Sequence, residues 1–66
     1  MGFYVVQELW SDGTIVVETD EETESEARAT AQKMFDDPTR EGDSVRIITI
    51  DGELVVELTE KGDHCA

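Results

Sequence analysis

Four stretches of the chain are rich in β-branched and aromatic residues, and each has the length of a single β-strand. The first two, FYVVQELW and TIVVET, span residues 3–10 and 14–19. The other two, SVRIITI and ELVVELT, span residues 44–50 and 53–59. The pattern therefore predicts two pairs of strands near the two ends of the chain.

Each pair of strands is joined through an Asp-Gly dipeptide, Asp12-Gly13 in the first and Asp51-Gly52 in the second. Asp-Gly favours a two-residue hairpin loop, in which both central residues have positive φ. Two antiparallel hairpins are therefore expected. This loop predicts the cross-strand pairs Trp10–Ile15, Leu9–Val16, Glu8–Val17, Ile48–Val55 and Ile47–Val56.

The segment between the hairpins changes to a helical pattern. Thr23 and Glu26 fit a capping box, and residues 24–36 are mostly good helix formers. The helix must end by about Asp37, because Pro38 disfavours helical backbone in the residue before it. Four apolar residues share one face of this helix at i, i+4, i+7, i+8 spacing: Ala27, Ala31, Met34 and Phe35.

These elements predict an α+β fold in β-β-α-β-β order, in which one helix packs on one face of a four-stranded antiparallel sheet. The 66 residues make one domain, residues 1–66, that buries about 60% of the surface of its unfolded chain. Residues 61–66, KGDHCA, are expected to form a frayed tail. The order of the strands in the sheet stays open.

In the second hairpin, alternation assigns Val45, Ile47, Leu54, Val56 and Leu58 to the core and Ile48, Ile50 and Val55 to the other face. In the first hairpin both faces are apolar, and either set can be the core: Phe3, Val5, Leu9 and Val16, or Tyr4, Val6, Trp10, Ile15 and Val17. Some apolar surface is left over in both cases. It serves self-association or a partner, or long neighbouring side chains cover it.

Charge is the strongest compositional signal. The chain has 17 acidic and 5 basic residues, a net charge of −12, and no basic residue precedes Arg28. Such a surface argues against direct binding to nucleic acid or an anionic membrane, and for a basic partner or metal cations. No signal peptide or membrane-spanning run is recognised, and Cys65 is the single cysteine. A reducing, cytoplasmic setting is therefore expected.

The sequence offers no catalytic constellation, and we expect no enzyme and no cofactor. The only histidine, His64, lies beside Cys65 in the expected tail, where no catalytic geometry is held. Alternating acids from Asp20 to Glu26 resemble part of an EF-hand loop. The required glycine and terminal glutamate are absent, so no metal site is predicted.

Two acidic groups flank the predicted helix, about 20 Å apart at 1.5 Å per residue. A charge run is usually a solvated face. Two such groups on a rigid scaffold can also imitate two rows of phosphates and occupy a basic DNA-binding groove. The candidate partner-binding residues are Glu18, Asp20, Glu21, Glu22, Glu24 and Glu26 before and in the first turn, and Asp36, Asp37, Glu41 and Asp43 at the other end.

The ETDEETESE run, the two Asp-Gly hairpins and the single capped helix together resemble small acidic phage anti-CRISPR proteins of the DNA-mimic kind, specifically type I-C inhibitors. The resemblance covers the whole layout but has no defining motif. It implies a stoichiometric inhibitor that acts in the host bacterial cytoplasm, occupies the DNA-binding subunits of a type I CRISPR surveillance complex and blocks target DNA. The alternative is an interaction module or antitoxin-like protein that forms homodimers through the uncovered sheet face.

Overall fold

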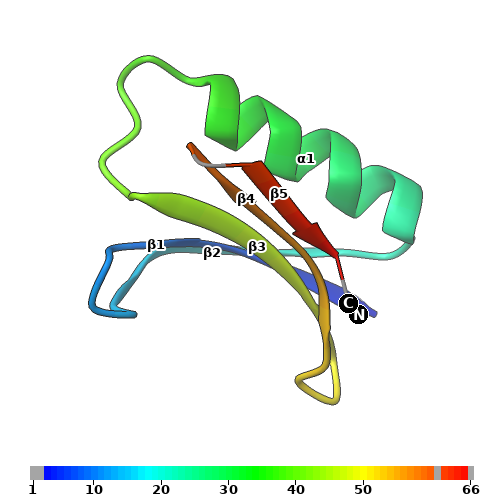
Figure 1. The fold of residues 1–66 in the computed structure, drawn as a ribbon. Helices are drawn as coiled ribbons and strands as arrows, with labels where there is room; N and C mark the ends of the chain where they lie inside the picture. The colour runs from blue at the N-terminus through cyan, green and yellow to red at the C-terminus, as the bar shows by residue number, and fades with distance from the viewer. Residues whose placement is uncertain (1–2, 61, 66) are drawn as a thin grey trace.

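The computed structural model describes residues 3–60 and 62–65, with the side chains of residues 63–65 excepted. One antiparallel sheet has the strand order β2-β1-β3-β4-β5, and one helix, α1, covers one of its faces (Figure 1). The predicted four-stranded antiparallel arrangement with a helix between the hairpins is confirmed. The elements are β1 (Tyr4–Leu9), β2 (Ile15–Glu21), α1 (Glu24–Asp36), β3 (Ser44–Thr49), β4 (Leu54–Thr59) and β5 (Gly62–Cys65).

A fifth strand stands where the sequence predicts a frayed tail. Gly62–Cys65 forms β5 and pairs antiparallel with β4, from Thr59↔Gly62 to Val56↔Cys65. The tail prediction is therefore wrong for these four residues, while residues 61 and 66 lie outside the described part of the chain. The sequence GDHC has no strand-forming pattern. The strand therefore forms because its backbone pairs with β4.

Both hairpins turn through a three-residue loop instead of the predicted two-residue loop. In the first hairpin, Gly13 N donates to Trp10 O and Trp10 N donates to Thr14 O, both at 2.9 Å. Gly13 has φ +93°, whereas no non-glycine residue in the described part of the chain has positive φ. The loop is thus a tight turn followed by a glycine bulge, and Asp12 does not need the left-handed conformation that the prediction assigned to it.

This loop changes the register near the first turn, and a second bulge then restores it. Leu9 pairs with Ile15, so the predicted Trp10–Ile15 and Leu9–Val16 pairs are wrong. The register shifts between Glu8 and Leu9, and Glu8 pairs with Val17 as predicted.

The second hairpin repeats the arrangement. Gly52, with φ +92°, donates its N–H to Thr49 O at 2.8 Å. Ile48 pairs with Leu54 instead of Val55, while Ile47 pairs with Val56 as predicted. The shift takes Leu54 out of the core, where the sequence placed it, and leaves it 39% exposed.

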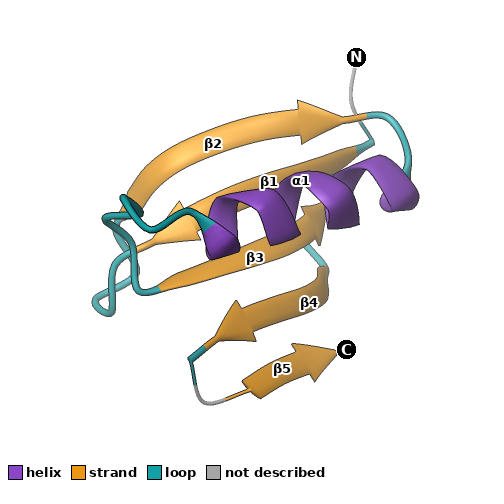
Figure 2. Ribbon diagram, turned by 90° about the horizontal axis from the view of Figure 1, so that it is seen from above, coloured by secondary structure: helices purple, strands orange, loops and turns teal. Residues whose placement is uncertain are grey.

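The core lies between α1 and the central strands. Figure 2 shows the helix above β1 and β3, and its buried residues are Ala27 and Ala31. Met34 and Phe35 pack against the same core, so the predicted helix face is confirmed. Small alanine side chains allow a close approach of helix to sheet. The sheet contributes the buried residues Val6, Val45, Ile47, Val56 and Leu58.

The first hairpin divides its apolar residues between both faces. Val6 is fully buried under the helix, and Tyr4 packs against that core. Val5 pairs with Ile48 on the face that α1 leaves bare, which we call the uncovered face. Near the centre of that face, Arg46 Nε donates to Gln7 Oε1 at 2.7 Å, and Gln7 Nε2 donates to Glu18 Oε2 at 2.6 Å. This polar row leaves Gln7 only 5% exposed.

The connection from α1 to β3 is tied to the first hairpin. Gly42 N donates to Glu8 Oε2 at 2.9 Å, and Asp43 N donates to Leu9 O at 2.7 Å. Ser11 N donates to Asp43 Oδ2 at 2.6 Å. Glu8 is only 6% exposed, so this backbone N–H stabilises a carboxylate that is almost fully removed from water. The loop is thereby held against the end of β1.

Candidate protein-binding surface

The acidic residues at the start of α1 include two that stabilise the helix. Thr23 caps it, because Glu26 N donates to Thr23 Oγ1 at 3.1 Å and Thr23 Oγ1 donates to Glu26 Oε1 at 3.1 Å. Glu24 forms a salt bridge of 2.9 Å with Arg28 one turn later. Both positions also interact favourably with the helix dipole. The exposed carboxylate of Glu22 has no hydrogen bond or ion pair within the described residues.

Strand β2 divides its acids between the two faces of the sheet. Glu18 pairs with Gln7 and Asp20 with Val5, so both carboxylates lie on the uncovered face. That they share one face follows from their i, i+2 spacing along the strand. Glu21 lies on the helix side, half-buried, and accepts a hydrogen bond of 3.0 Å from Thr30 Oγ1. The structure thus places Glu18 and Asp20 together and separates Glu21 from them.

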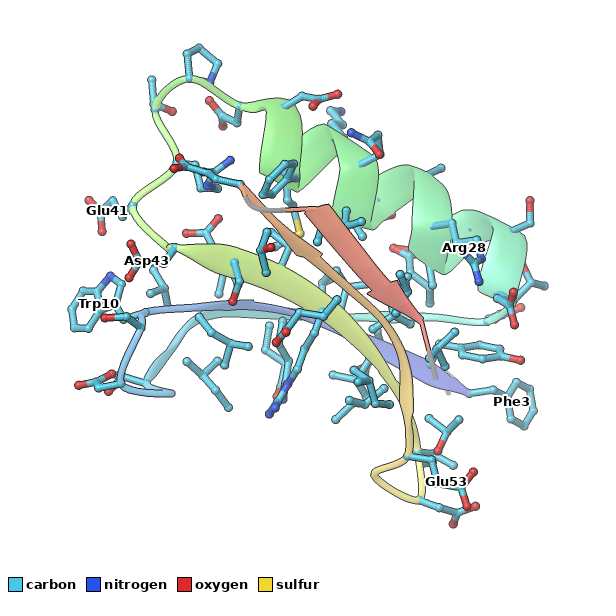
Figure 3. The ribbon with its side chains drawn as sticks, viewed as in Figure 1. Phe3, Trp10, Arg28, Glu41, Asp43 and Glu53 are labelled. Atoms are coloured by element: carbon cyan, nitrogen blue, oxygen red, sulfur yellow. The ribbon has the colours of Figure 1, made fainter. Side chains whose placement is uncertain are left out.

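A second acidic group lies at the other end of the helix. Asp36 accepts from Gln32 Nε2 at 2.9 Å, and Asp37 accepts from both Thr39 Oγ1 and Thr39 N. These two bonds, the side-chain one foremost, lower the pKa of Asp37 below its usual range. Glu41 is exposed beside Asp43 in the same loop, as Figure 3 shows. All four residues predicted for this group therefore lie in or next to one connection.

The loop also brings in an acid that sequence reasoning missed. Asp43 binds the first hairpin through Ser11 N, and Asp12 is the next residue in that turn. The Thr14 hydroxyl and backbone N–H lower the pKa of Asp12, which stays ionised at neutral pH. Asp12 lies beside this loop only because Ser11 and Asp43, far apart in sequence, are in contact. No local sequence pattern could therefore have predicted that Asp12 belongs to this acidic group.

Among the described cations, Arg28 pairs with Glu24, while Arg40 and Arg46 are bonded to residues outside the two acidic groups. Arg40 donates Nε to Gly42 O at 2.9 Å and Nη1 to Phe35 O, and its guanidinium lies 4.4 Å from the centre of the Phe35 ring. Its side chain is 14% exposed. Arg46 is held in the polar row of the uncovered face. Two of the five basic residues are thus used in hydrogen bonds that stabilise the fold, and much of the acidic surface has no basic partner.

A third acidic pair, Asp51 and Glu53, lies at the tip of the β3–β4 hairpin, away from the helix (Figure 3). The exposed side chains of Phe3 and Ile50 are at the same end of the sheet, where Ile50 N donates to Phe3 O at 3.1 Å. This pair lies apart from the two acidic groups that flank the helix.

The described side chains assemble no group of three or more His, Cys, Asp or Glu residues that could hold a metal ion. His64 and Cys65 lie in β5, and their side chains are outside the described part of the structure. None of the described helices is both long and apolar enough to span a membrane. The chain matches no protein-family model, no curated protein and no solved structure.

Proposed function

We propose that this protein is a non-enzymatic inhibitor that binds a basic, DNA-binding surface of another protein. The observation that carries the proposal is the placement of exposed carboxylates at both ends of α1, while Arg40 and Arg46 are hydrogen-bonded to other groups, Gly42 O and Gln7 Oε1. Such a surface presents negative charge at two sites of one small rigid body. A basic groove that accepts two phosphate rows can accept it for the same electrostatic reason.

The partner proposed within this class is the DNA-binding part of a type I CRISPR surveillance complex, in the cytoplasm of a host bacterium. The resemblance to small acidic anti-CRISPR proteins supports this choice. Bound in that groove, the protein would exclude target DNA by occupying its site, and no bond would be made or broken. The inhibition would therefore be stoichiometric, and target DNA would compete with it.

Competition between the protein and target DNA tests the proposal. Purified type I complex would be mixed with fluorescent target DNA and increasing amounts of the protein. The charge variant is Asp20→Asn/Glu22→Gln, and the matched control is Asp51→Ser/Glu53→Gln. None of these four carboxylates has a hydrogen bond or salt bridge within the described residues, so each variant removes two charges at little cost in stability.

We expect the wild type and the control to displace DNA equally, and the charge variant to need at least tenfold more protein. Equal displacement by both variants would show that the acids at the helix start are not the binding surface. No displacement by the wild type would overturn the proposed partner.

A second candidate is self-association through the uncovered face. Val5 and Ile48 are half-buried there although no helix covers them, and Ile15 is 47% exposed. A concentration-dependent mass in sedimentation equilibrium, abolished by Ile48→Thr, would favour this candidate over the inhibitor.

A further inference from the structure

Strand β2 forms one edge of the sheet. It spans seven residues, pairs with β1 on one side and has no strand on the other, while α1 lies over β1 and β3 (Figure 2). Every second residue of such an edge points its N–H and C=O outward without a partner strand. Folded proteins usually protect a free edge from pairing with charged side chains, above all lysine, with proline or with a bulge.

Two of these devices occur in β2: a bulge at its start, and acidic side chains along the rest, which repel an acidic strand but not a basic one. The bulge lies near Ile15, where the register shifts, and the pairing from Val17 to Glu21 is regular. That regular stretch contains no lysine and no proline. Its outer edge therefore keeps the geometry that a further strand needs.

The charges on β2 select the kind of strand that can add there. Glu18 and Asp20 share the uncovered face, and the Asp20 carboxylate has no partner within the described residues. A side chain directly across an antiparallel pair lies about 5 Å away, so lysine or arginine at alternate positions would pair with both acids.

The same charges disfavour a second copy of this chain. Antiparallel self-pairing centred on Glu18 would place two Glu18 side chains opposite each other and Ile15 opposite Glu21. Like charges directly opposite are destabilising, and each copy carries a net charge of −12.

We propose that β2 binds an extended basic segment of the partner by strand addition, with basic side chains at alternate positions over Glu18 and Asp20. This inference rests on the proposed function, because it names how the basic partner is held. Backbone hydrogen bonds along the edge supply the geometry, and the carboxylates supply the charge selection. Val17, 46% exposed on the other face of the strand, offers apolar contact to the intervening residues.

The test uses the whole protein and synthetic peptides. The probe is a capped seven-residue peptide that alternates lysine with threonine or valine. Two further peptides have the same sequence but carry N-methyl groups on one or the other set of alternate amides. N-methylation removes the donors of one edge of the peptide and leaves its charge unchanged. Binding is followed by amide chemical shifts and by hydrogen exchange of the protein at low salt.

We expect the unmethylated peptide to bind, to protect outward amides between Val17 and Glu21, and to bind at least tenfold more tightly than one of the methylated peptides. The Glu18→Gln/Asp20→Asn variant should lose at least fivefold in affinity, while Asp51→Ser/Glu53→Gln should bind as the wild type does.

Equal affinity for all three peptides would overturn strand addition and leave the proposed function standing, because charge attraction alone would then explain binding. Pairing of β2 with a second copy, seen as dimerisation without peptide, would also overturn it. Binding of none of the basic peptides would overturn the strand addition and would count against the proposed function as well.

Discussion

Replacement of Gly42 by alanine should destabilise the fold strongly. A Cβ at this position would lie closer than 3.0 Å to Glu8 Cγ, 3.1 Å from Glu8 Cδ and 3.0 Å from Leu9 O. Leu9 O is fixed, since it accepts from Asp43 N at 2.7 Å. Glu8 cannot move aside without losing the Gly42 N–H that stabilises its buried carboxylate.

The magnitude follows from two terms. Overpacking of a well-packed site costs about 1–3 kcal/mol, and loss of a hydrogen bond to a charged group costs about 1.5–3 kcal/mol. Partial relaxation will relieve some of each, so we expect a loss of about 3 kcal/mol. A domain of this length has a free energy of unfolding of roughly 3–10 kcal/mol, so the loss is a large fraction of the total.

Urea unfolding followed by the fluorescence of Trp10, the only tryptophan, measures the effect. With a slope of roughly 1 kcal/mol per molar urea, the midpoint should fall by about 3 M. The control is the same substitution in a Glu8→Ala background, where both clashing Glu8 atoms are gone and only the 3.0 Å contact with Leu9 O remains. Gly42 is not among the glycines with positive φ, so alanine suits its backbone. There the substitution should cost less than about 1 kcal/mol.

Two results would refute this reasoning. One is a Gly42→Ala protein within about 0.5 kcal/mol of the wild type, the usual range of a harmless surface change. The other is an equal loss in the two backgrounds, because the cost would then not come from Glu8.

Three further predictions concern other parts of the fold. Arg40→Ala leaves the carbonyls of Phe35 and Gly42 without the donor that Arg40 supplies. The free energy of unfolding should fall by about 2 kcal/mol, which lowers the melting temperature by roughly 10 °C. An unchanged melting temperature would contradict this. Gly52→Ala places a side chain on a backbone with φ +92°, although no atom lies within 4 Å of the added Cβ. The backbone conformation alone should therefore cost about 1–2 kcal/mol of the free energy of unfolding. In urea unfolding, D-alanine at the same position should cost nothing. The lowered pKa of Asp37 means that its contribution to stability is present above its unfolded pKa of about 3.9 and is lost as pH falls through the folded value. Carboxyl NMR should show this pKa rising towards the usual range in Thr39→Val, and no rise would exclude the Thr39 hydroxyl as the cause.

Local signals explain why most of the fold could be predicted. The capping residue Thr23 and the proline after the helix mark the bounds of α1, and alternation identifies Val45, Ile47, Val56 and Leu58 as core. The turn type could not be predicted in the same way. Asp-Gly suits both a two-residue loop and a tight turn with a glycine bulge, and only the second needs a single positive φ. The choice changes the pairs next to each turn and exposes Leu54.

The part of the candidate surface that could not be predicted depends on contacts between residues far apart in the sequence. Alternation along β2 was enough to place Glu18 and Asp20 on one face. The positions of Asp12 and Asp43 depend on a loop that binds the first hairpin, and no local pattern encodes that contact. Strand β5 is a similar case, because its sequence is a poor strand former and its pairing partner is what orders it.

The central claim is that exposed carboxylates bind a basic surface, and the salt dependence of binding tests it most directly. The dissociation constant for the purified type I complex would be measured at several salt concentrations for the wild type and Asp20→Asn/Glu22→Gln. We predict that the wild type weakens steeply and linearly on a log–log plot, and that the variant binds more weakly with a shallower slope. A dissociation constant that does not change with salt, or equal slopes for the two proteins, would contradict the claim.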